Sequence, residues 1–571
     1  MLFDLPSDPS PDNIVTDDLS RAELFQKYFL SVYTNDNSIT HPPLNINNYN
    51  DTYIDYVDIT AEDVYKELKS LPTKSNISPD GIPYIFLKKT ADTISSPLCH
   101  IFCRSLLTGK VPTVWKKAII RPIHKKGSKL DPQNYRPISL TCATSKLLER
   151  LVARRLKKYF NDNHYFSAYQ YGFLDKRSTS SVLLRTVQCW LSHVDNGGYI
   201  DCLYFDFRKA FDSVSLPKLF LKMSSYGIHG SLHRWLCDFL TGRSLAVSIN
   251  NKICKFETFH NGVPQGSVLG PLLFLIFIND LTSSLPPDST CFLYADDIKV
   301  FTYLDNLQCI FNAVDQWAHK WLLPLAPEKT TLIRFGKKNL NNPVVINGSR
   351  LLASSTVKDL GVTINSSHRF HDHISNIVRK ANTRSLILRP FSTRDPFVLT
   401  GLFIVYVRPL LEYASQVWSP SNPNFDKRYV NMIENVQRRF TKRVLRRCIS
   451  TEARTYTERL KTLSLQTLEF RRFFFDLVMV YCIVQNEIHL SFDEFFMISP
   501  NIGRTRFSNR YKLFIKRYRS NAFKYFFSNR VIHAWNSLPQ QTVDASSIKS
   551  FKNLLLKVIP VSLGFRSLID P

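Results

Sequence analysis

The residues of this sequence best suited to metal-dependent chemistry are three aspartates at the ends of apolar segments. Asp296 and Asp297 stand side by side in segment 291–303, flanked by two short apolar runs that predict a hairpin. Asp206 lies near the end of segment 200–207, which is predicted to be a strand. If that strand lies beside the hairpin, three carboxylates meet, and such like charges need a cation to share the site. Hard oxygen ligands of this kind suit Mg²⁺.

Two divalent ions held in this way can activate an attacking 3′-hydroxyl and steady a pyrophosphate leaving group. Phosphoryl transfer needs little else beyond positioning and charge stabilisation. The alternative is that the Asp296-Asp297 pair is simply a favourable turn. The residues around the three aspartates must decide between these interpretations.

The elements around the aspartates are strands, basic loops and amphipathic helices. Segment 118–120 is predicted to be a strand, and a basic loop follows at residues 124–127. That loop suits contact with phosphates, and it is equally compatible with a solvated hairpin tip. A helix is expected from Ser145 onward and another over residues 216–225, each with an apolar face.

The overall charge favours a polyanionic partner. The chain of 571 residues carries 74 Lys and Arg against 47 Asp and Glu, a net charge of +27. The length predicts two to four folded units. Its first 80 residues are acidic, with 14 Asp and Glu against 5 Lys and Arg, so the basic excess belongs to the remainder. Within this arm, residues 22–32 predict a single amphipathic helix that packs loosely, and a further helix begins at Thr60.

Several classes of protein are disfavoured by the sequence. The start lacks the basic and apolar regions of a signal peptide, and apolar segments 271–278 and 473–484 are too short to span a bilayer. The 11 cysteines include no Cys-x-x-Cys pair, which argues against a disulfide framework or a zinc finger and favours a reducing compartment. Cys99 and Cys103, one helical turn apart, are interpreted as buried packing residues.

Ordered blocks of the sequence lie around the three aspartates, at residues 204–212, 261–271, 294–297, 329–330 and 360–364, with further blocks upstream at 120–127, 134–140 and 171–173. The first five blocks resemble motifs A to E of the reverse transcriptases of non-LTR (LINE-type) retrotransposons, including jockey- and CR1-like elements, and the upstream blocks also resemble this family. The resemblance covers residues 60–370 approximately. Weaker similarity to the family continues at residues 504–506 and 535–539.

The resemblance implies an α+β right-hand polymerase of fingers, palm and thumb, with an antiparallel palm sheet and a basic helical C-terminal region. The expected units are an acidic arm (1–59), an N-terminal extension of the fingers (60–104), a reverse transcriptase domain of fingers and palm (105–368), a thumb-like helical region (369–465) and a basic, aromatic C-terminal region (466–571).

The same resemblance implies roles for individual residues. Asp206 and Asp296 would bind two Mg²⁺ ions, or Mn²⁺, with help from the Phe207 carbonyl, and Asp297 would support them. Phe211 falls where the family has an aromatic ring that excludes the 2′-hydroxyl of a ribonucleotide.

Further residues are expected around the incoming nucleotide. Gln265 would face the pairing region, and Arg136, assisted by Lys125 or Lys126, would grip the triphosphate. Lys329 would protonate pyrophosphate, although Ala326 and Pro327 depart from the family's usual loop.

Two basic segments beyond these blocks are candidate contacts with nucleic acid. Residues 427–447 predict a basic amphipathic helix, with Arg438, Arg439, Lys442 and Arg443 able to track a phosphate backbone. A surface helix that only aids solubility is the alternative. Residues 504–530 interleave basic and aromatic side chains, including Arg506 and Arg510, as in proteins that bind single-stranded RNA. A helical core with cationic rims is the alternative there.

The hypothesis is an RNA-directed DNA polymerase that uses an RNA template, a DNA primer and deoxynucleoside triphosphates. The family leads us to expect an intracellular ribonucleoprotein, nuclear or cytoplasmic, without membrane association. No endonuclease or RNase H block is recognised, so a truncated product or a fragment is expected. The rival hypotheses are an RNA-binding remnant without turnover and a maturase- or telomerase-like polymerase.

Overall fold

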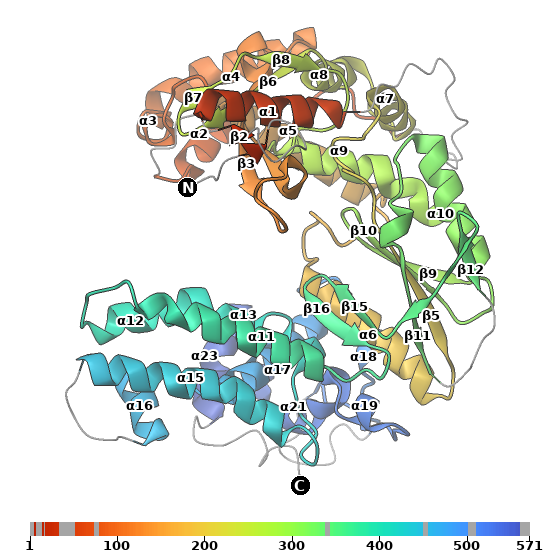
Figure 1. Ribbon diagram of the computed structural model, residues 1–571, viewed down its shortest axis with the longest axis vertical. Coiled ribbons are helices and arrows are strands. Elements are labelled where there is room, and N and C mark those ends of the chain that lie inside the picture. The colour runs from red at the N-terminus through yellow and green to blue at the C-terminus, as the bar shows by residue number, and fades with distance from the viewer. Residues whose placement is uncertain are drawn as a thin grey trace.

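The computed structural model describes residues 5–6, 14–15, 17–33, 52–73, 79–336, 343–448, 455–500 and 510–559. The fold is α+β, as expected, with several sheets and many helices. In Figure 1 the chain follows an arc, with the N-terminal part at the top, a central sheet at the right and the C-terminal helices at the bottom.

The central sheet is the element that carries the aspartates. Its strands, in spatial order, are Ala353–Ser354 (β14), Thr331–Phe335 (β11), Ile200–Phe205 (β5), Asp297–Thr302 (β10) and Ser289–Tyr294 (β9). Neighbouring strands are antiparallel except β14, which pairs with β11 in parallel. The predicted hairpin is therefore β9–β10. The predicted strand 200–207 is correct except that it ends at Phe205.

Side chains of the central sheet alternate between two cores, as a strand period of two requires. In β5, Leu203 and Phe205 enter a first core, whereas Cys202 enters a second core that includes much of the C-terminal half. In β10, Ile298 enters the first core and Phe301 the second. By this alternation the aspartates that follow β5 and begin β10 share the second face, which we term the carboxylate face.

A second five-stranded sheet lies at the top of Figure 1. Its strands are Tyr135–Leu140 (β4), Lys117–His124 (β3), Arg243–Ile249 (β6) and Lys252–Ile253 (β7), with Glu257–Phe259 (β8) also paired to β6. The basic loop predicted after segment 118–120 follows β3 directly, because β3 and β4 form a hairpin.

The expectation that the helix of the acidic arm packs loosely is wrong. The helix Asp18–Ser31 (α1) lies against β6 and buries Ala22, Phe25 and Phe29. The Phe25 ring meets the Tyr135 ring edge to face at 4.8 Å. These aromatic and aliphatic groups form a separate small core with the sheet, so the helix belongs to the folded body.

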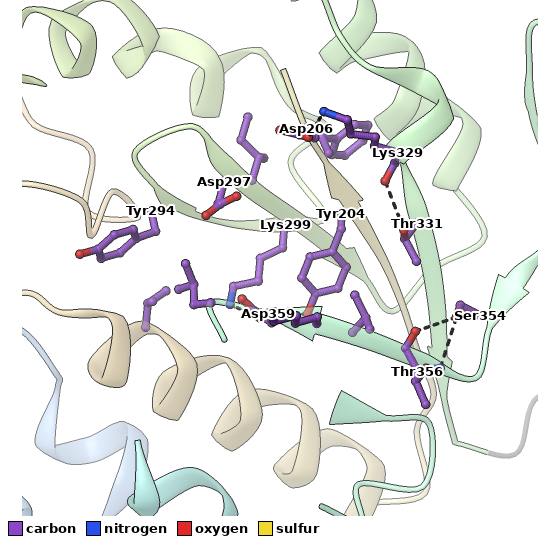
Figure 2. Close-up of a pocket in the computed structure, with 16 residues that line it drawn as sticks. Tyr204, Asp206, Tyr294, Asp297, Lys299, Lys329, Thr331, Ser354, Thr356 and Asp359 are labelled. Carbon is purple, nitrogen blue, oxygen red and sulfur yellow. Dashed lines mark hydrogen bonds and ion pairs between the residues drawn. The ribbon is translucent and has the colours of Figure 1, made fainter. Parts of the chain in front are cut away.

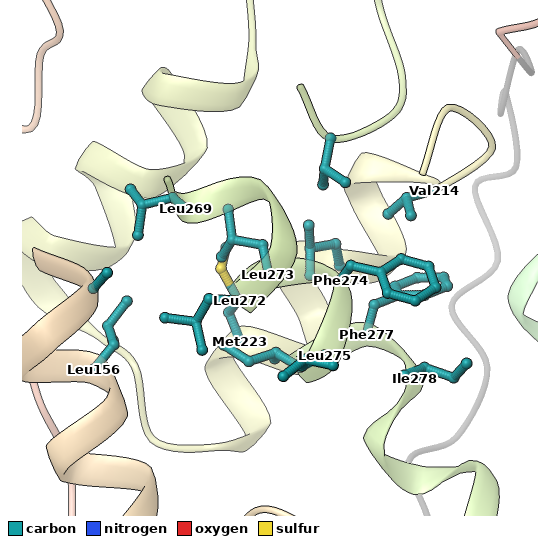
Figure 3. Close-up of a cluster of buried hydrophobic side chains, with 14 of the residues drawn as sticks. Leu156, Val214, Met223, Leu269, Leu272, Leu273, Phe274, Leu275, Phe277 and Ile278 are labelled. Atoms are coloured by element: carbon teal, nitrogen blue, oxygen red, sulfur yellow. The ribbon is translucent and has the colours of Figure 1, made fainter. Parts of the chain in front are cut away.

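Several helices build the first core, and one of them, Leu269–Ile278, is apolar on every side. They are Ala61–Ser70 (α2), Tyr84–Lys89 (α3), Ala91–Thr108 (α4), Ala143–Asp162 (α5), Leu216–Ser225 (α7), Gly230–Leu240 (α8), Leu269–Ile278 (α9) and Leu307–Trp321 (α10). Figure 3 shows α9 packed among Leu156 of α5, Met223 of α7 and Val214. The apolar run at 271–278 is thus a core helix. In the described ranges no helix is long and apolar enough to cross a bilayer.

The helices expected from Thr60, from Ser145 and over residues 216–225 correspond to α2, α5 and α7, although α5 begins two residues earlier than expected, at Ala143. Thr60 caps α2 by accepting a hydrogen bond from Asp63, as predicted. Cys99 and Cys103 pack against the first core, and both thiols donate to the Ile59 carbonyl. Their placement favours the interpretation as packing residues.

The C-terminal half is helical. Its helices are His371–Arg384 (α11), Pro396–Leu402 (α12), Arg408–Glu412 (α13), Ser415–Trp418 (α14), Lys427–Cys448 (α15), Tyr456–Thr462 (α16), Leu468–Val484 (α17), Phe492–Phe495 (α18), Asn521–Lys524 (α19), Phe527–Arg530 (α20), Ile532–Asn536 (α21), Gln540–Val543 (α22) and Ile548–Val558 (α23). Together with Thr179–Asp195 (α6), they build the second core below the central sheet. The predicted basic helix at 427–447 is α15.

A buried ion pair ties α17 to α20. Asp476 interrupts the apolar run of α17, and Arg530 donates to its two carboxylate oxygens at 2.9 and 3.1 Å. Both side chains are only 1% exposed. Loss of one partner leaves an uncompensated charge in the second core.

Replacing Asp476 by Ala is therefore expected to destabilise the C-terminal half by about 3–5 kcal/mol. Denaturant unfolding monitored by tryptophan fluorescence measures this change. The matched control is Glu62→Ala, which removes an exposed pair with Lys66 (3.3 Å) and should cost less than about 0.5 kcal/mol. Equal effects of the two substitutions would contradict the importance given to burial.

Candidate active site

The chain leaves the central sheet directly after β5, and this departure sets the position of Asp206. Residues 206–208 pair with residues 324–326 through two backbone hydrogen bonds, Ala326 N to Asp206 O (2.8 Å) and Arg208 N to Pro324 O (2.9 Å). A short 3-10 turn, Pro327–Lys329 (η4), follows and brings Lys329 back to the strand end. Its Nζ lies 2.8 Å from Asp206 Oδ2 (Figure 2).

The turn that carries the other two aspartates is held by a buried glutamine. Ala295 has a φ of 56°, in the left-handed region, and Asp297 pairs with Tyr294 across the hairpin. Gln170 Oε1 accepts hydrogen bonds from Ala295 N (2.9 Å) and Gly172 N (2.8 Å). A Cβ on Gly172 would stand 2.4 Å from Ala295 N, so only glycine fits there.

Gln170 is a positioning residue that sequence reasoning missed. The block 171–173 was recognised, and the residue immediately before it was not. A glutamine in a loop carries no distinctive signal, since its role depends on a turn that lies 125 residues further along the chain.

Burial and mutual repulsion disfavour ionisation of the neighbouring aspartates. Desolvation by the surrounding protein raises the pKa of Asp296, and the charge of Asp206 raises it further. Desolvation, Asp296 and Asp206 raise the pKa of Asp297 to about 6, although its side chain still reaches solvent. A cation near these oxygens would relieve the repulsion.

The carboxylates converge without already forming a complete ligand set. Among the residues that the structure describes, no three His, Cys, Asp or Glu side chains are grouped at the spacing of a metal site. The Lys329 ammonium instead neutralises Asp206. The donor set is nevertheless chemically suited to a hard divalent cation, because all the available ligands are oxygens that carry excess negative charge. The Phe207 carbonyl lies outside the two hydrogen bonds that pair segment 206–208.

A cluster of cations from the β3–β4 hairpin faces the aspartates. Arg136 pairs with Ile123 at the exposed end of that hairpin, and the Lys125 amide donates to Asn134 O. Desolvation, followed by the charge of Arg136, lowers the pKa of Lys125, and the charge of Asp206 opposes this change. The charges of Lys125 and Arg136 in turn oppose the rise in the pKa of Asp296, which desolvation dominates.

The sequence therefore identified groups that do interact. Lys125, Arg136 and Lys329 come from three separate blocks. Lys125 and Arg136 act electrostatically on Asp296, and Lys329 forms an ion pair with Asp206. A polyanion such as a triphosphate fits between cations of this kind.

Phe211 and Gln265 lie on two loops that lock together. The Phe211 ring stacks on Phe274 at 4.5 Å and meets Phe173 edge on. Gln265 Nε2 lies 2.9 Å from both carboxylate oxygens of Asp212. The Val263 amide donates to the Phe211 carbonyl, so the loop of residues 261–268 follows the loop of residues 207–213. Asp212 was not predicted as a site residue, and burial raises its pKa to about 6.

The predicted contacts on α15 form an exposed row. Arg439, Lys442 and Arg443 are exposed at helical spacing, while the opposite side of α15 packs into the second core. Arg438 lies 5.1 Å above the Tyr456 ring. The single acid of the segment, Glu434, is buried and accepts hydrogen bonds from the first amides of α17.

In the described part of the basic, aromatic segment, residues 510–530, some aromatic rings are buried and are not free on the surface. Phe523 and Phe526 are buried in the second core, which favours the interpretation as a helical core with cationic rims. Arg510 pairs with Asp544 at 3.1 Å. Arg506 lies outside the described residues.

Comparison with known proteins identifies the domain that carries these groups. Residues 123–364 match the family described as reverse transcriptase (RNA-dependent DNA polymerase). They form a reverse transcriptase domain. All three aspartates, Arg136, Lys125 and Lys329 lie within this domain.

The reverse transcriptase domain is related to polymerases of non-LTR retrotransposons. The chain is 28% identical to the RNA-directed DNA polymerase from mobile element jockey of Drosophila melanogaster, over 68% of this chain and 44% of the relative. It is 30% identical to the jockey enzyme of Drosophila funebris (63% and 41%) and to the "Probable RNA-directed DNA polymerase from transposon BS" of Drosophila melanogaster (63% and 42%). The chain spans less than half the length of each of these relatives.

Because the folded pKa of Asp297 is raised to about 6, its ionisation should destabilise the protein in the presence of a metal chelator. The folded state holds this proton more tightly than the unfolded state. Stability is therefore gained as the pH falls through about 6 and lost as the pH rises. Asp297→Asn should raise the melting temperature at pH 7.5 and lose this advantage below pH 5, as measured by differential scanning fluorimetry. An advantage that did not change with pH would contradict the charge repulsion.

Proposed function

We propose that this protein is an RNA-directed DNA polymerase that joins deoxynucleotides to a primer 3′-hydroxyl on an RNA template. One observation carries the proposal. Lys125 and Arg136 of the β3–β4 hairpin act electrostatically on Asp296, which lies beside Asp297, and Lys329 forms an ion pair with Asp206, so the aspartates have three cations as neighbours. Such opposed charges suit a metal-bound triphosphate, and membership of the domain in the reverse transcriptase family supports the same reaction.

The roles of the acidic residues follow from their positions. Asp206 and Asp296 would hold two Mg²⁺ ions, or Mn²⁺, with the Phe207 carbonyl, while Asp297 steadies the site from the start of β10. When bound, such ions lower the pKa of the attacking hydroxyl and stabilise the charge of the leaving pyrophosphate.

The roles of the basic residues follow from the charge of the substrate. Arg136 would bind phosphate oxygens in a bidentate manner, and Lys125 would add a point charge. Lys329 would donate a proton to the departing pyrophosphate. Its contact with Asp206 supports this role, because the ammonium already lies where negative charge collects.

Substrate choice would depend on Phe211 and Gln265. The Phe211 ring is fixed between Phe173 and Phe274, so it resists displacement by an additional hydroxyl on the sugar. Gln265 would face the nascent base pair, and its hydrogen bonds to Asp212 would hold the loop in place.

The architecture we infer is a right hand. The central sheet would be the palm and the β3–β4 hairpin part of the fingers, within a unit of residues 105–368 that follows an arm (1–59) and an extension (60–104). Residues 369–465 would act as a thumb, followed by the C-terminal region, 466–571.

The exposed row of Arg439, Lys442 and Arg443 would follow the phosphate backbone of the template and primer. Arg438, Arg506 and Arg510 would also contact nucleic acid. The proposed partners are an RNA template, a DNA primer and deoxynucleoside triphosphates. The protein would act inside the cell as part of a ribonucleoprotein.

Primer extension tests the proposed function. With an RNA template, a DNA primer, Mg²⁺ and deoxynucleotides, the wild-type chain should extend the primer. Asp296→Asn should lower the rate by about a thousandfold or more, since a metal ligand contributes several kcal/mol to the transition state. Asp288→Asn, an exposed position at the other end of β9, is the matched control and should retain activity. Tight RNA binding without extension by any variant would indicate an RNA-binding remnant instead.

Substitution of Phe211 tests the sugar preference. Phe211→Val should increase ribonucleotide incorporation relative to deoxynucleotide incorporation by about tenfold or more, because the smaller side chain leaves room for the 2′-hydroxyl. Phe211→Tyr keeps the ring and serves as the control. The ratio of kcat/KM for the two nucleotides is the measurement, and an unchanged ratio in the valine variant would remove this role.

A further inference from the structure

The loop that carries Gln265 leads directly into a helix whose first turn lies inside the protein. This loop spans residues 261–268, and α9 begins at Leu269. Leu269 and Gly270 are buried. The first amides of a helix have no partner within it, and a buried amide without a partner is costly. The start of α9 therefore needs acceptors from other parts of the protein.

Two side chains supply these acceptors. Glu149 Oε2, from the middle of α5, accepts hydrogen bonds from Val268 N at 2.7 Å and from Leu269 N at 3.2 Å. Ser267 Oγ accepts from the next amide at 2.9 Å, and position 271 is a proline, which has no amide hydrogen. The amides at the start of α9 are thus accounted for, and Glu149 provides the contact with a distant segment.

Both carboxylate oxygens of Glu149 are engaged in hydrogen bonds. The residue is 1% exposed, and its Oε1 accepts from Ser145 Oγ at 3.1 Å. Desolvation raises the pKa of Glu149, and the hydrogen bond from Leu269 N and the charge of the buried Arg243 oppose this rise. Because a buried carboxylate is tolerated only when such partners are present, the position of Glu149 relative to the loop is closely determined.

Glu149 also connects the loop to the strand that carries Arg136. That strand, β4, ends two residues before α5 begins. It touches the loop directly as well, because the Ser139 amide donates to the Gln265 carbonyl at 2.8 Å. A Cβ on Gly266 would stand 2.6 Å from the Ser139 carbonyl oxygen, so the two backbones lie close together. The loop is held against β4 in its middle and against α5 at its end.

We propose that Glu149 is a positioning residue for base selection, because its hydrogen bonds fix the loop of residues 261–268 and hence the distance between Gln265 and Arg136. This inference rests on the proposed function, in which Gln265 faces the nascent base pair and Arg136 binds the triphosphate. A correctly paired nucleotide has a defined distance between its base and its triphosphate, so a site that enforces this distance favours the correct nucleotide. Glu149 itself contacts neither nucleotide nor metal.

A second buried glutamate with the same local contacts provides a matched control. Glu434 is 4% exposed and accepts from Leu468 N at 3.0 Å and from Glu469 N at 3.3 Å, where α17 begins. Leu468 belongs to the second core, whereas Leu269 belongs to the first. Loss of Glu434 should therefore lower stability as loss of Glu149 does, without changing base selection.

Binding of matched and mismatched deoxynucleotides tests the proposal without requiring the chemical step. The full-length chain is bound to an RNA template and a DNA primer that ends in a dideoxynucleotide. The Kd of each deoxynucleotide is measured from the ternary complex that resists a DNA competitor. The preference for the matched nucleotide should fall by about tenfold in Glu149→Leu, which has a similar volume and no acceptor. Glu149→Gln, whose amide oxygen still accepts from the loop, and Glu434→Leu should keep the wild-type preference.

Hydrogen exchange shows whether the loop is the cause. The amides of residues 261–270 should exchange faster in Glu149→Leu than in the wild type and at the wild-type rate in Glu434→Leu. A lower base preference with unchanged exchange in this segment would contradict the proposed route. If Glu149→Leu does not fold, Glu149→Asp replaces it, because aspartate keeps the charge and is one methylene too short to reach the loop.

The inference is overturned if loss of the Glu149 contact leaves the base preference unchanged, or if Glu434→Leu lowers the preference equally. A wild-type chain that forms nucleotide-dependent complexes without extending an unblocked primer overturns the proposed function, while the comparison of preferences still tests Glu149. A wild-type chain that forms no such complex overturns both.

Discussion

Antiparallel pairing of β5 with β10 is the interaction on which the site depends. The register places Ile298 opposite Phe205. Asp297 precedes Ile298 and Asp206 follows Phe205, so the two aspartates are brought together where the strands end. A shift by one residue would turn these side chains toward the opposite face, where the first core lies. The two cores, which take alternate side chains of both strands, make such a shift costly.

This register concentrates negative charge, and the rest of the fold supplies the compensation. Cations reach the aspartates from the β3–β4 hairpin and from Lys329, which arrives through the pairing of segments 206–208 and 324–326. Gln170 and Gly172 hold the turn without adding charge. Strain at Ala295 and repulsion between carboxylates are tolerated because the surrounding packing determines their positions, as is common at functional sites.

Local features were predictable from the sequence, and contacts between distant segments were not. The β9–β10 hairpin and α15 depend on neighbouring residues, so apolar spacing located them. The end of β5 was misplaced because residues 206–208 pair with a segment more than 100 residues away. Glu149 lies 119 residues from Val268, and a lone glutamate within a helix gives no sign of such a partner. Aromatic composition alone did not show whether the rings stack on bases or are buried in the protein. Phe523 is buried.

We propose that Asp206, Asp296 and Asp297 form one divalent-cation site beside a cluster of cations that binds triphosphate. Binding of Mn²⁺ followed by electron paramagnetic resonance tests it most directly, in the presence of primer, RNA template and a non-hydrolysable deoxynucleotide analogue. The wild-type chain should hold two tightly bound ions, and Asp206→Asn should lose both or bind them far more weakly. Equal numbers of tightly bound Mn²⁺ ions in the wild type and in Asp206→Asn would contradict the account.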